Sequence, residues 1–188
     1  MSEIRTVMET RLMRAGATLL LALFLFFCGC RAKEPPLSPA AASFKKAVQE
    51  EIARLAPPLL EPVAKRSPAQ INVTLQKIFS DPKNEGPLWP YKIVVTDKNG
   101  VSLGKYPVEK GFSMDFSNYS VVQKCLKDCK TSYGRLFSAK GAKFYIICSP
   151  ILKGEEIKGI LALSLDGAEV DKKWGLSEQE FLALEFDR

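Results

Sequence analysis

The chain of 188 residues contains no histidine. This absence excludes the Ser-His-Asp triad, ordinary zinc-enzyme ligand sets, histidine phosphotransfer and covalent haem attachment through a CxxCH motif. The sequence also lacks a glycine-rich phosphate loop, and its acidic residues form no motif for paired acid and base catalysis. We therefore expect that the protein is not an enzyme and that it uses no cofactor.

A hydrophobic run of membrane-spanning length is also missing. The apolar run from Ala15 to Phe27 has thirteen residues and follows Arg11 and Arg14, which is typical of a signal peptide. It ends in Phe27-Cys28-Gly29-Cys30, which resembles a bacterial lipobox. The resemblance implies that residues 1–29 are a lipoprotein signal peptide and that Cys30 is acylated, with palmitate as part of its lipid. An uncleaved anchor and a plain secretory signal are the alternatives, and all three export the chain.

The charge shows no strong excess of either sign. The formal net charge is +6, and basic residues are spread among acidic ones, so we expect no nucleic-acid partner.

Residues 30–42 are rich in Pro and Ala and predict a tether that holds a domain off a membrane. Arg31 stands where inner-membrane lipoproteins of enteric bacteria carry Asp, which favours the outer membrane, with the domain facing the periplasm.

Two helices are expected first. Apolar residues recur at helical spacing from Ser43, and Pro57-Pro58 predicts the end of this helix after three to four turns. Ser67, Pro68 and Gln70 predict the start of a second helix with a capping box.

The rest of the chain alternates at strand spacing around one further helix. Asn99-Gly100 predicts a tight hairpin turn between strands 91–97 and 101–106. A helix over 121–129, strands over 133–138, 143–151 and 157–166, and a capped helix over 177–184 follow. This order predicts an α+β domain with a five-stranded antiparallel sheet and a long N-terminal helix.

Three segments resemble those of a known family: VTDKNGVSLG at 95–104, MDFSNYS at 114–120 and SPILKGEEIKGILALSLD at 149–166. In this order they are similar to the extracytoplasmic PAS-like sensor domains called Cache. The resemblance implies a Cache-like domain over 43–166, followed by a C-terminal helical tail over 167–188. Many relatives bind carboxylates or amino acids through an arginine at the position of Asn118, so the ligand class here stays open.

The last two strands define the expected site. Leu161, Leu163 and Leu165 share one face of the final strand, whereas Ile160, Ala162 and Ser164 share the other, mixed face. In the preceding strand we assign Phe144, Ile146 and Cys148 to the apolar face and Tyr145 and Ile147 to the mixed face. In the Cache-like arrangement the apolar face packs on the N-terminal helix, and the mixed face forms the floor of a ligand site beside helix 121–129.

Five side chains are then expected to line this site: Tyr119, Tyr133, Arg135, Tyr145 and Asp166. The ordinary alternative is a half-buried core position for each tyrosine and a surface charge for Arg135 and Asp166.

Three cysteines remain after Cys30 in the exported domain. Cys125, Cys129 and Cys148 are expected to be buried thiols, with a redox-sensing Cys125/Cys129 pair as the alternative. The assignment of strand faces places Cys148 on the side of the sheet away from the other two.

These observations predict a membrane-anchored extracytoplasmic module that senses or binds a small molecule and has no output domain of its own. Its partners would be an unknown solute, the membrane through the lipid, and a signalling or envelope protein. The alternative is an envelope lipoprotein that uses a PAS-like fold for protein contacts only. We expect the C-terminal helix to pack on its own domain.

Overall fold

The computed structural model describes residues 37–80, 86–88, 90–109 and 111–186. The predicted signal peptide, Cys30 and most of the predicted tether lie outside these residues. The chain divides into two units, Met1–Pro36 and Leu37–Arg188, and the described residues belong to the second. None of its described helices is both long enough and apolar enough to span a membrane.

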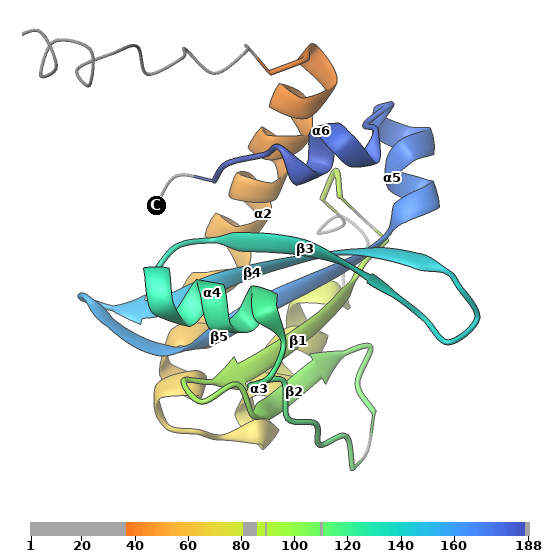
Figure 1. The fold of residues 1–188 in the computed structure, drawn as a ribbon. Helices are drawn as coiled ribbons and strands as arrows, with labels where there is room; N and C mark the ends of the chain where they lie inside the picture. The colour runs from red at the N-terminus through yellow and green to blue at the C-terminus, as the bar shows by residue number, and fades with distance from the viewer. Residues whose placement is uncertain (1–36, 81–85, 89, 110, 187–188) are drawn as a thin grey trace, which may run out of the picture. The chain divides into compact units, whose positions relative to one another are not determined.

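The described elements form one sheet with helices on both faces (Figure 1). The strands have the order β2-β1-β5-β4-β3, and every neighbouring pair is antiparallel. This confirms the predicted α+β class with its five-stranded antiparallel sheet. In chain order the elements are α2 (Pro39–Ala64), α3 (Pro68–Phe79), β1 (Lys92–Asp97), β2 (Ser102–Tyr106), α4 (Ser120–Asp128), β3 (Ser132–Phe137), β4 (Lys143–Lys153), β5 (Glu156–Asp166), α5 (Gly167–Trp174) and α6 (Glu178–Leu182).

Helix α2 is longer than the sequence predicts. It starts at Pro39, where the Ser38 hydroxyl accepts a hydrogen bond from the Ala41 amide at 3.1 Å, and it continues through Pro57-Pro58. The prediction that these prolines end the helix is therefore wrong. An interior proline costs a helix about 3 kcal/mol. Burial offsets that cost, because Leu55, Leu59 and Val63 are fully buried and each such side chain contributes about 1.5–3 kcal/mol.

Two of the predicted caps can be compared with the structure. The Ser177 capping box is present at α6, with Glu180 as its partner. At α3 the Ser67 side chain makes no capping hydrogen bond, so the box predicted with Gln70 does not form. Helix α5 falls within the predicted helical tail 167–188 but was not predicted as a separate element; it starts after the Asp166 N-cap and ends at Gly175, where φ is +63°.

The β1–β2 turn is organised by a buried carboxylate. Asp97 Oδ1 accepts hydrogen bonds from the amides of Asn99 and Val101 at 2.8 and 3.0 Å, and its other oxygen pairs with Arg66 after α2. Gly100, with φ of +85°, supplies the left-handed residue that the hairpin prediction requires. One side chain therefore joins the turn to the end of the long helix.

The two faces of the sheet are covered unequally. Helices α2 and α3 lie on one face, together with the C-terminal segment, residues 167–186. Of the described helices, only α4 lies on the other face (Figure 1). We call these the α2 face and the α4 face. Leu161, Leu163 and Leu165 pack in the large cluster of the α2 face, as predicted, and Ile160 packs against α4 in a smaller cluster.

The predicted faces of β4 are wrong. Tyr145 lies directly opposite Leu165, and Ile147 lies opposite Leu163. Opposed residues on neighbouring antiparallel strands point to the same side of a sheet. Tyr145 and Ile147 therefore belong to the α2 face. Alternation divides each strand into two faces, but only the pairing register decides which faces of two strands coincide.

The C-terminal segment is part of the main core, in agreement with the expected packing on its own domain. Phe181 and Leu184 are fully buried in the α2-face cluster. The Phe181 ring stacks on Tyr145 with centroids 4.0 Å apart and meets Phe44 of α2 edge to face at 6.1 Å. Helix α6 thus joins β4 to α2.

Replacing Phe181 with alanine tests this role. We expect Phe181→Ala to lower the free energy of unfolding by about 3 kcal/mol or more, because a fully buried ring is removed from a packed core. The neighbouring Leu182 is 42% exposed, so Leu182→Ala should change it by less than about 0.5 kcal/mol. Urea unfolding measures both, and equal losses would contradict the packing described.

Candidate functional site

A cavity of about 310 Å³ lies between the α4 face of the sheet, helix α4 and the loop that joins β2 to α4. Its volume is at the lower end of the range of small-molecule sites. We call it the α4-side cavity. The strands contribute Val94, Ile146, Cys148, Ala162 and Ser164, the helix contributes Val121 and Val122, and the loop contributes Phe112, Met114, Phe116 and Tyr119.

The register of the strands explains the floor of the cavity. Val94, Ala162 and Cys148 lie opposite one another on β1, β5 and β4, with Lys105 at the β2 end of this row. In the next row Ser164 lies between Lys92 and Ile146. Opposed residues share a face, so both rows point to the same side. The floor is apolar in its centre and carries lysines on the β1 and β2 side.

The β2–α4 loop is fixed along the edge strand β2. The Ser102 amide donates to the Met114 carbonyl, and the Phe116 amide donates to the Gly100 carbonyl, both at 2.9 Å. Asp115 accepts a hydrogen bond from the Ser117 amide at 2.8 Å, and the Ser117 hydrogen bonds lower the pKa of the Asp115 carboxyl. These contacts place the rings of Phe116 and Tyr119, with centroids 5.4 Å apart, at the cavity wall.

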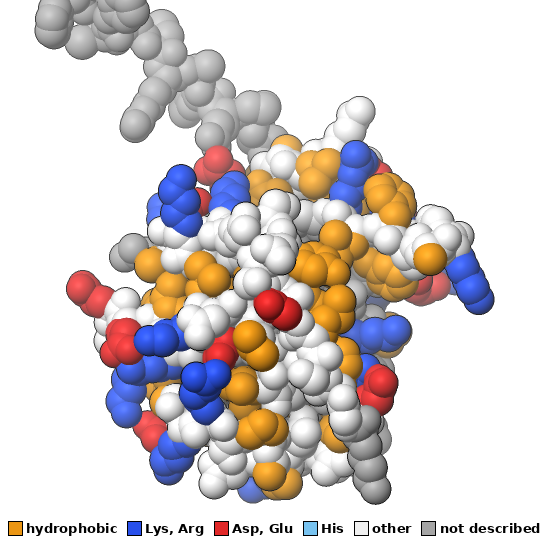
Figure 2. Space-filling model, turned by 60° about the horizontal axis from the view of Figure 1, so that its bottom comes forward, with side chains coloured by type: hydrophobic (Ala, Val, Ile, Leu, Met, Phe, Trp, Pro, Cys, Tyr) orange, Lys and Arg blue, Asp and Glu red, His pale blue; other side chains and the backbone are white. Residues whose placement is uncertain are grey.

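The opening region of the cavity is itself partly apolar. Met114 is 41% exposed and Leu136 is 37% exposed, and both line the cavity. On the side of the domain that Figure 2 shows, hydrophobic side chains reach the surface in several groups, while charged side chains gather mostly toward the edges. Apolar side chains are therefore exposed to solvent where the cavity opens.

Of the five predicted site residues, the α4-side cavity contains Tyr119. Tyr145 is buried on the α2 face, where its hydroxyl donates to Asp171 at 3.3 Å. Arg135, opposite Tyr145, forms an ion pair with Glu178 of α6. The expectation that all five line one site is wrong, because the register turns Tyr145 and Arg135 away from α4.

Asp166 has a structural contact of its own. Its carboxylate accepts hydrogen bonds from the amides of Ala168 and Glu169 at 2.9 and 3.4 Å, which caps α5. It lines a more open hollow of about 400 Å³ that adjoins the α4-side cavity at Lys92 and Ser164.

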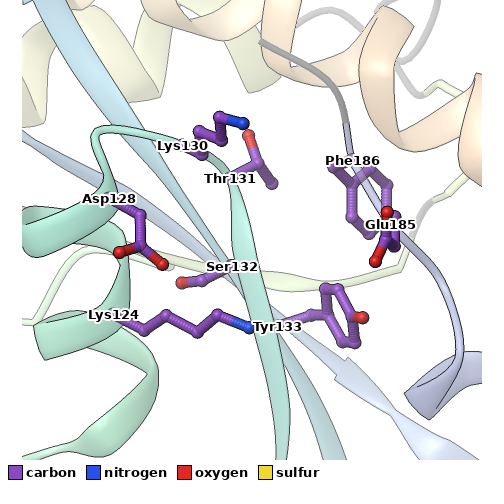
Figure 3. A pocket seen from close by; sticks show the side chains of 8 residues that line it. All are labelled: Lys124, Asp128, Lys130, Thr131, Ser132, Tyr133, Glu185 and Phe186. Atoms are coloured by element: carbon purple, nitrogen blue, oxygen red, sulfur yellow. The ribbon is translucent and has the colours of Figure 1, made fainter. Parts of the chain in front are cut away.

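Tyr133 lines a separate pocket of about 200 Å³ at the outer edge of β3 (Figure 3). Lys124 and Asp128 of α4 lie on one side of this pocket, and Glu185 and Phe186 of the C-terminal segment lie on the other. Burial and the charge of Glu185 raise the pKa of the Tyr133 phenol.

Two hydroxyl groups of this edge pocket are already engaged. Ser132 donates to the Val121 carbonyl at 2.6 Å, and Thr131 donates to Ser149 at 3.1 Å. Both signs of charge also line the edge pocket, whereas none of the acidic residues that the structure describes lines the α4-side cavity. The α4-side cavity is therefore the better candidate for a solute with an apolar body.

Comparisons with known proteins identify the fold. The chain matches no protein-family model and no curated protein sequence. It does superimpose on solved structures of sensory domains. One is a domain of a protein assigned to the sensory box/GGDEF family of Vibrio parahaemolyticus, with a TM-score of 0.52, 12% identity, and coverage of 74% of this chain and 60% of that one.

A second is an extracellular ligand-binding receptor from Desulfohalobium retbaense, with a TM-score of 0.53, 12% identity, and coverage of 71% and 25% of the two chains. A third is the extracellular domain of a protein assigned as a histidine kinase, with a TM-score of 0.51, 12% identity, and coverage of 74% and 57%. The fold is that of PAS-like, Cache-like sensor domains. The chain spans less than two thirds of the length of each of these structures, and the likeness concerns the fold.

Most of the residues that line the α4-side cavity were not predicted from the sequence. Lys92, Lys105 and Phe116 were not singled out, and Ile146 was assigned to the opposite face. The pairing of Val94 with Ala162 and of Ala162 with Cys148 identifies the floor of the cavity. The sequence of a single strand does not determine this register. The mixed character of Ile160, Ala162 and Ser164 was the signal that pointed to the correct side.

The three cysteines of the described domain are free thiols. Cys125 and Cys148 are buried in the cluster beneath α4, so the prediction that Cys148 faces away from Cys125 is wrong. The error follows from the same inverted faces of β4. Cys129 is partly exposed and ends α4 in the left-handed conformation, with φ of +51°. Among the described residues no group of three His, Cys, Asp or Glu side chains could hold a metal ion.

Thiol labelling tests this placement. Burial raises the pKa of the Cys125 thiol to about 12, so at pH 8 only about one molecule in ten thousand carries the thiolate. We expect a water-soluble maleimide to modify Cys129 first, and Cys125 and Cys148 only when the protein unfolds. Peptide mapping by mass spectrometry reads out each site. A disulfide that joins Cys125 to Cys129, or equal labelling rates, would contradict this account.

Proposed function

We propose that this Cache-like domain binds a small molecule in the α4-side cavity and acts as an extracytoplasmic sensing or binding module. The observation that carries the proposal is the cavity itself, which lies beside Tyr119 and has an apolar floor across three strands. A domain that used this fold for protein contacts alone would have no need to keep such a space unfilled.

The position of the cavity suits a site whose occupancy is passed on to a partner protein. Its wall includes α4 and the β2–α4 loop, whereas the large core of the α2 face lies on the other side of the sheet. A ligand can therefore change the packing of α4 without opening the main core. We infer that occupancy is passed to a partner protein through this smaller layer of the domain.

A cavity-filling substitution tests the function. We expect Ala162→Leu to remove ligand binding and keep the fold, because the larger side chain occupies empty space on the cavity floor. Thermal unfolding against small carboxylates, amino acids, amines and nucleobases is the measurement. A ligand at a hundred times its dissociation constant stabilises by about 2.7 kcal/mol.

The matched control is Ala168→Leu, which makes the same change at an exposed position of α5. It should keep every stabilisation seen with the unsubstituted protein. The proposal fails if no member of the panel stabilises the unsubstituted protein, or if Ala162→Leu leaves the stabilisation unchanged.

We also propose that the protein is a lipoprotein of the cell envelope, anchored through Cys30 and sorted to the outer membrane. The support is the sequence Phe27-Cys28-Gly29-Cys30 after an apolar run, together with the Pro- and Ala-rich segment that follows it. Palmitate labelling in a bacterial host checks this. We expect label on the native chain and none on Cys30→Ser, with Cys28→Ser still labelled. Label on Cys30→Ser would contradict the assignment.

A further inference from the structure

We propose that the ligand of the α4-side cavity is an anion with an apolar body, such as a monocarboxylate with an alkyl or aryl chain. The inference rests on the proposed function and adds the chemical class. It follows from the distribution of apolar and charged groups around the cavity.

The walls select an apolar body. Above the floor, Val121 and Val122 of α4 and the ring of Phe116 face the cavity, and Ile146 and Ala162 lie in the sheet below. Polar groups in such a setting are stable only when a partner satisfies them. Tyr106, Tyr119 and Ser164 also line the cavity, and the Thr96 hydroxyl donates to the Asp97 carbonyl, so a solute with polar groups along its whole length would find few partners here.

The charged groups at the cavity have one sign. Among the described residues, Lys92 and Lys105 are the charged ones that line it, and no described aspartate or glutamate does so. They come from neighbouring strands on the same face, because Lys105 lies opposite Val94 and Lys92 is two residues before Val94 on β1. The lysines are therefore at one end of the floor, where they form a cationic site for one anionic group.

The nearest acidic groups leave this charge available. Glu109 pairs with Lys105, but its side chain is 62% exposed, and pairs of this kind contribute little to stability. Asp166 lies in the adjoining hollow and is engaged by the amide groups of α5. Within the part of the chain that the structure describes, Lys92 forms no ion pair. An anion that excludes water from Lys105 can therefore compete with Glu109.

This arrangement disfavours other solute classes. An amine or a zwitterionic amino acid needs an acceptor for its ammonium group, and no carboxylate lines the cavity. A dicarboxylate needs a second cation at the far end, where the apolar side chains of Val121, Val122 and Ile146 lie. One anionic head on an apolar body satisfies both parts of the wall.

Four probes with matched parts test the inference: octanoate, octylamine, octan-1-ol and acetate. Binding to the full chain in lipid nanodiscs is measured by titration calorimetry, with empty nanodiscs as the blank for partition into lipid. We expect octanoate to bind, octan-1-ol to bind about tenfold or more weakly, and octylamine and acetate to show no binding. The tenfold difference corresponds to about 1.4 kcal/mol for the lost charge-assisted hydrogen bond.

Substitution of the lysines tests the contribution of the anionic group separately from that of the apolar chain. The double variant Lys92→Met, Lys105→Met should bind octanoate about tenfold or more weakly and bind octan-1-ol as the unsubstituted protein does. Lys98→Met, at an exposed position in the β1–β2 turn, is the matched control and should change neither affinity.

The outcomes distinguish the ligand class from the proposed function. If octylamine or an amino acid binds and Ala162→Leu removes that binding, the cavity is a ligand site and the anionic class is overturned. If octanoate binds equally to Ala162→Leu, the cavity is not its site, and both proposals are overturned. Octanoate binding that is lost in Ala162→Leu and weakened in the double lysine variant supports both.

Discussion

The pairing of β4 with β5 is the interaction on which the rest of the structure depends. It places Tyr145 and Ile147 beside Leu165 and Leu163, and it places Cys148 beside Ala162. A shift of one residue would exchange the two faces of β4 and move the Tyr145 ring from Phe181 to the floor of the cavity. One register thus decides both what packs under α2 and what is left to line a site under α4.

The unequal covering of the two faces produces the cavity. The α2 face is closed by a helix of 26 residues, by α3, and by the buried side chains of α6 and the segment after it. The α4 face is covered by a helix of nine residues and by the β2–α4 loop. A short helix cannot fill the width of five strands, so space remains where the loop passes over β1 and β2. The large core and the candidate site therefore lie on opposite sides of one sheet.

This division also explains the tolerance of α2 for its prolines. A helix that is buried along its length by Phe44, Val48, Leu55, Leu59 and Val63 gains more from packing than it loses at Pro57 and Pro58. The buried Asp97 has a related role, because it joins the β1–β2 turn to Arg66 at the end of the same helix. The α2 side is therefore held together at several points, whereas the α4 side has the smaller of the two hydrophobic clusters.

The sequence predicted the five strands and the described helices other than α5, in their order, because periodicity and turn residues are local properties. It predicted the two faces of β5 correctly, since Leu161, Leu163 and Leu165 are uniform and Ile160, Ala162 and Ser164 are not. It failed at the faces of β4, where both sets of alternate residues contain apolar side chains and only the non-local pairing distinguishes them. For this reason Arg135 and Tyr145 lie away from the α4-side cavity, whereas Tyr119, at the end of the β2–α4 loop, lines it.

The most direct test of a ligand site on the α4 face is a methyl spectrum of the protein as octanoate is added, with Ala, Ile and Val methyl groups labelled. The account predicts shifts at Val94, Ile146 and Ala162 and unchanged signals at Val48 and Val63 on the α2 side. Octanoate binding that leaves the signals of Val94, Ile146 and Ala162 unchanged, or shifts spread over both faces, would contradict it.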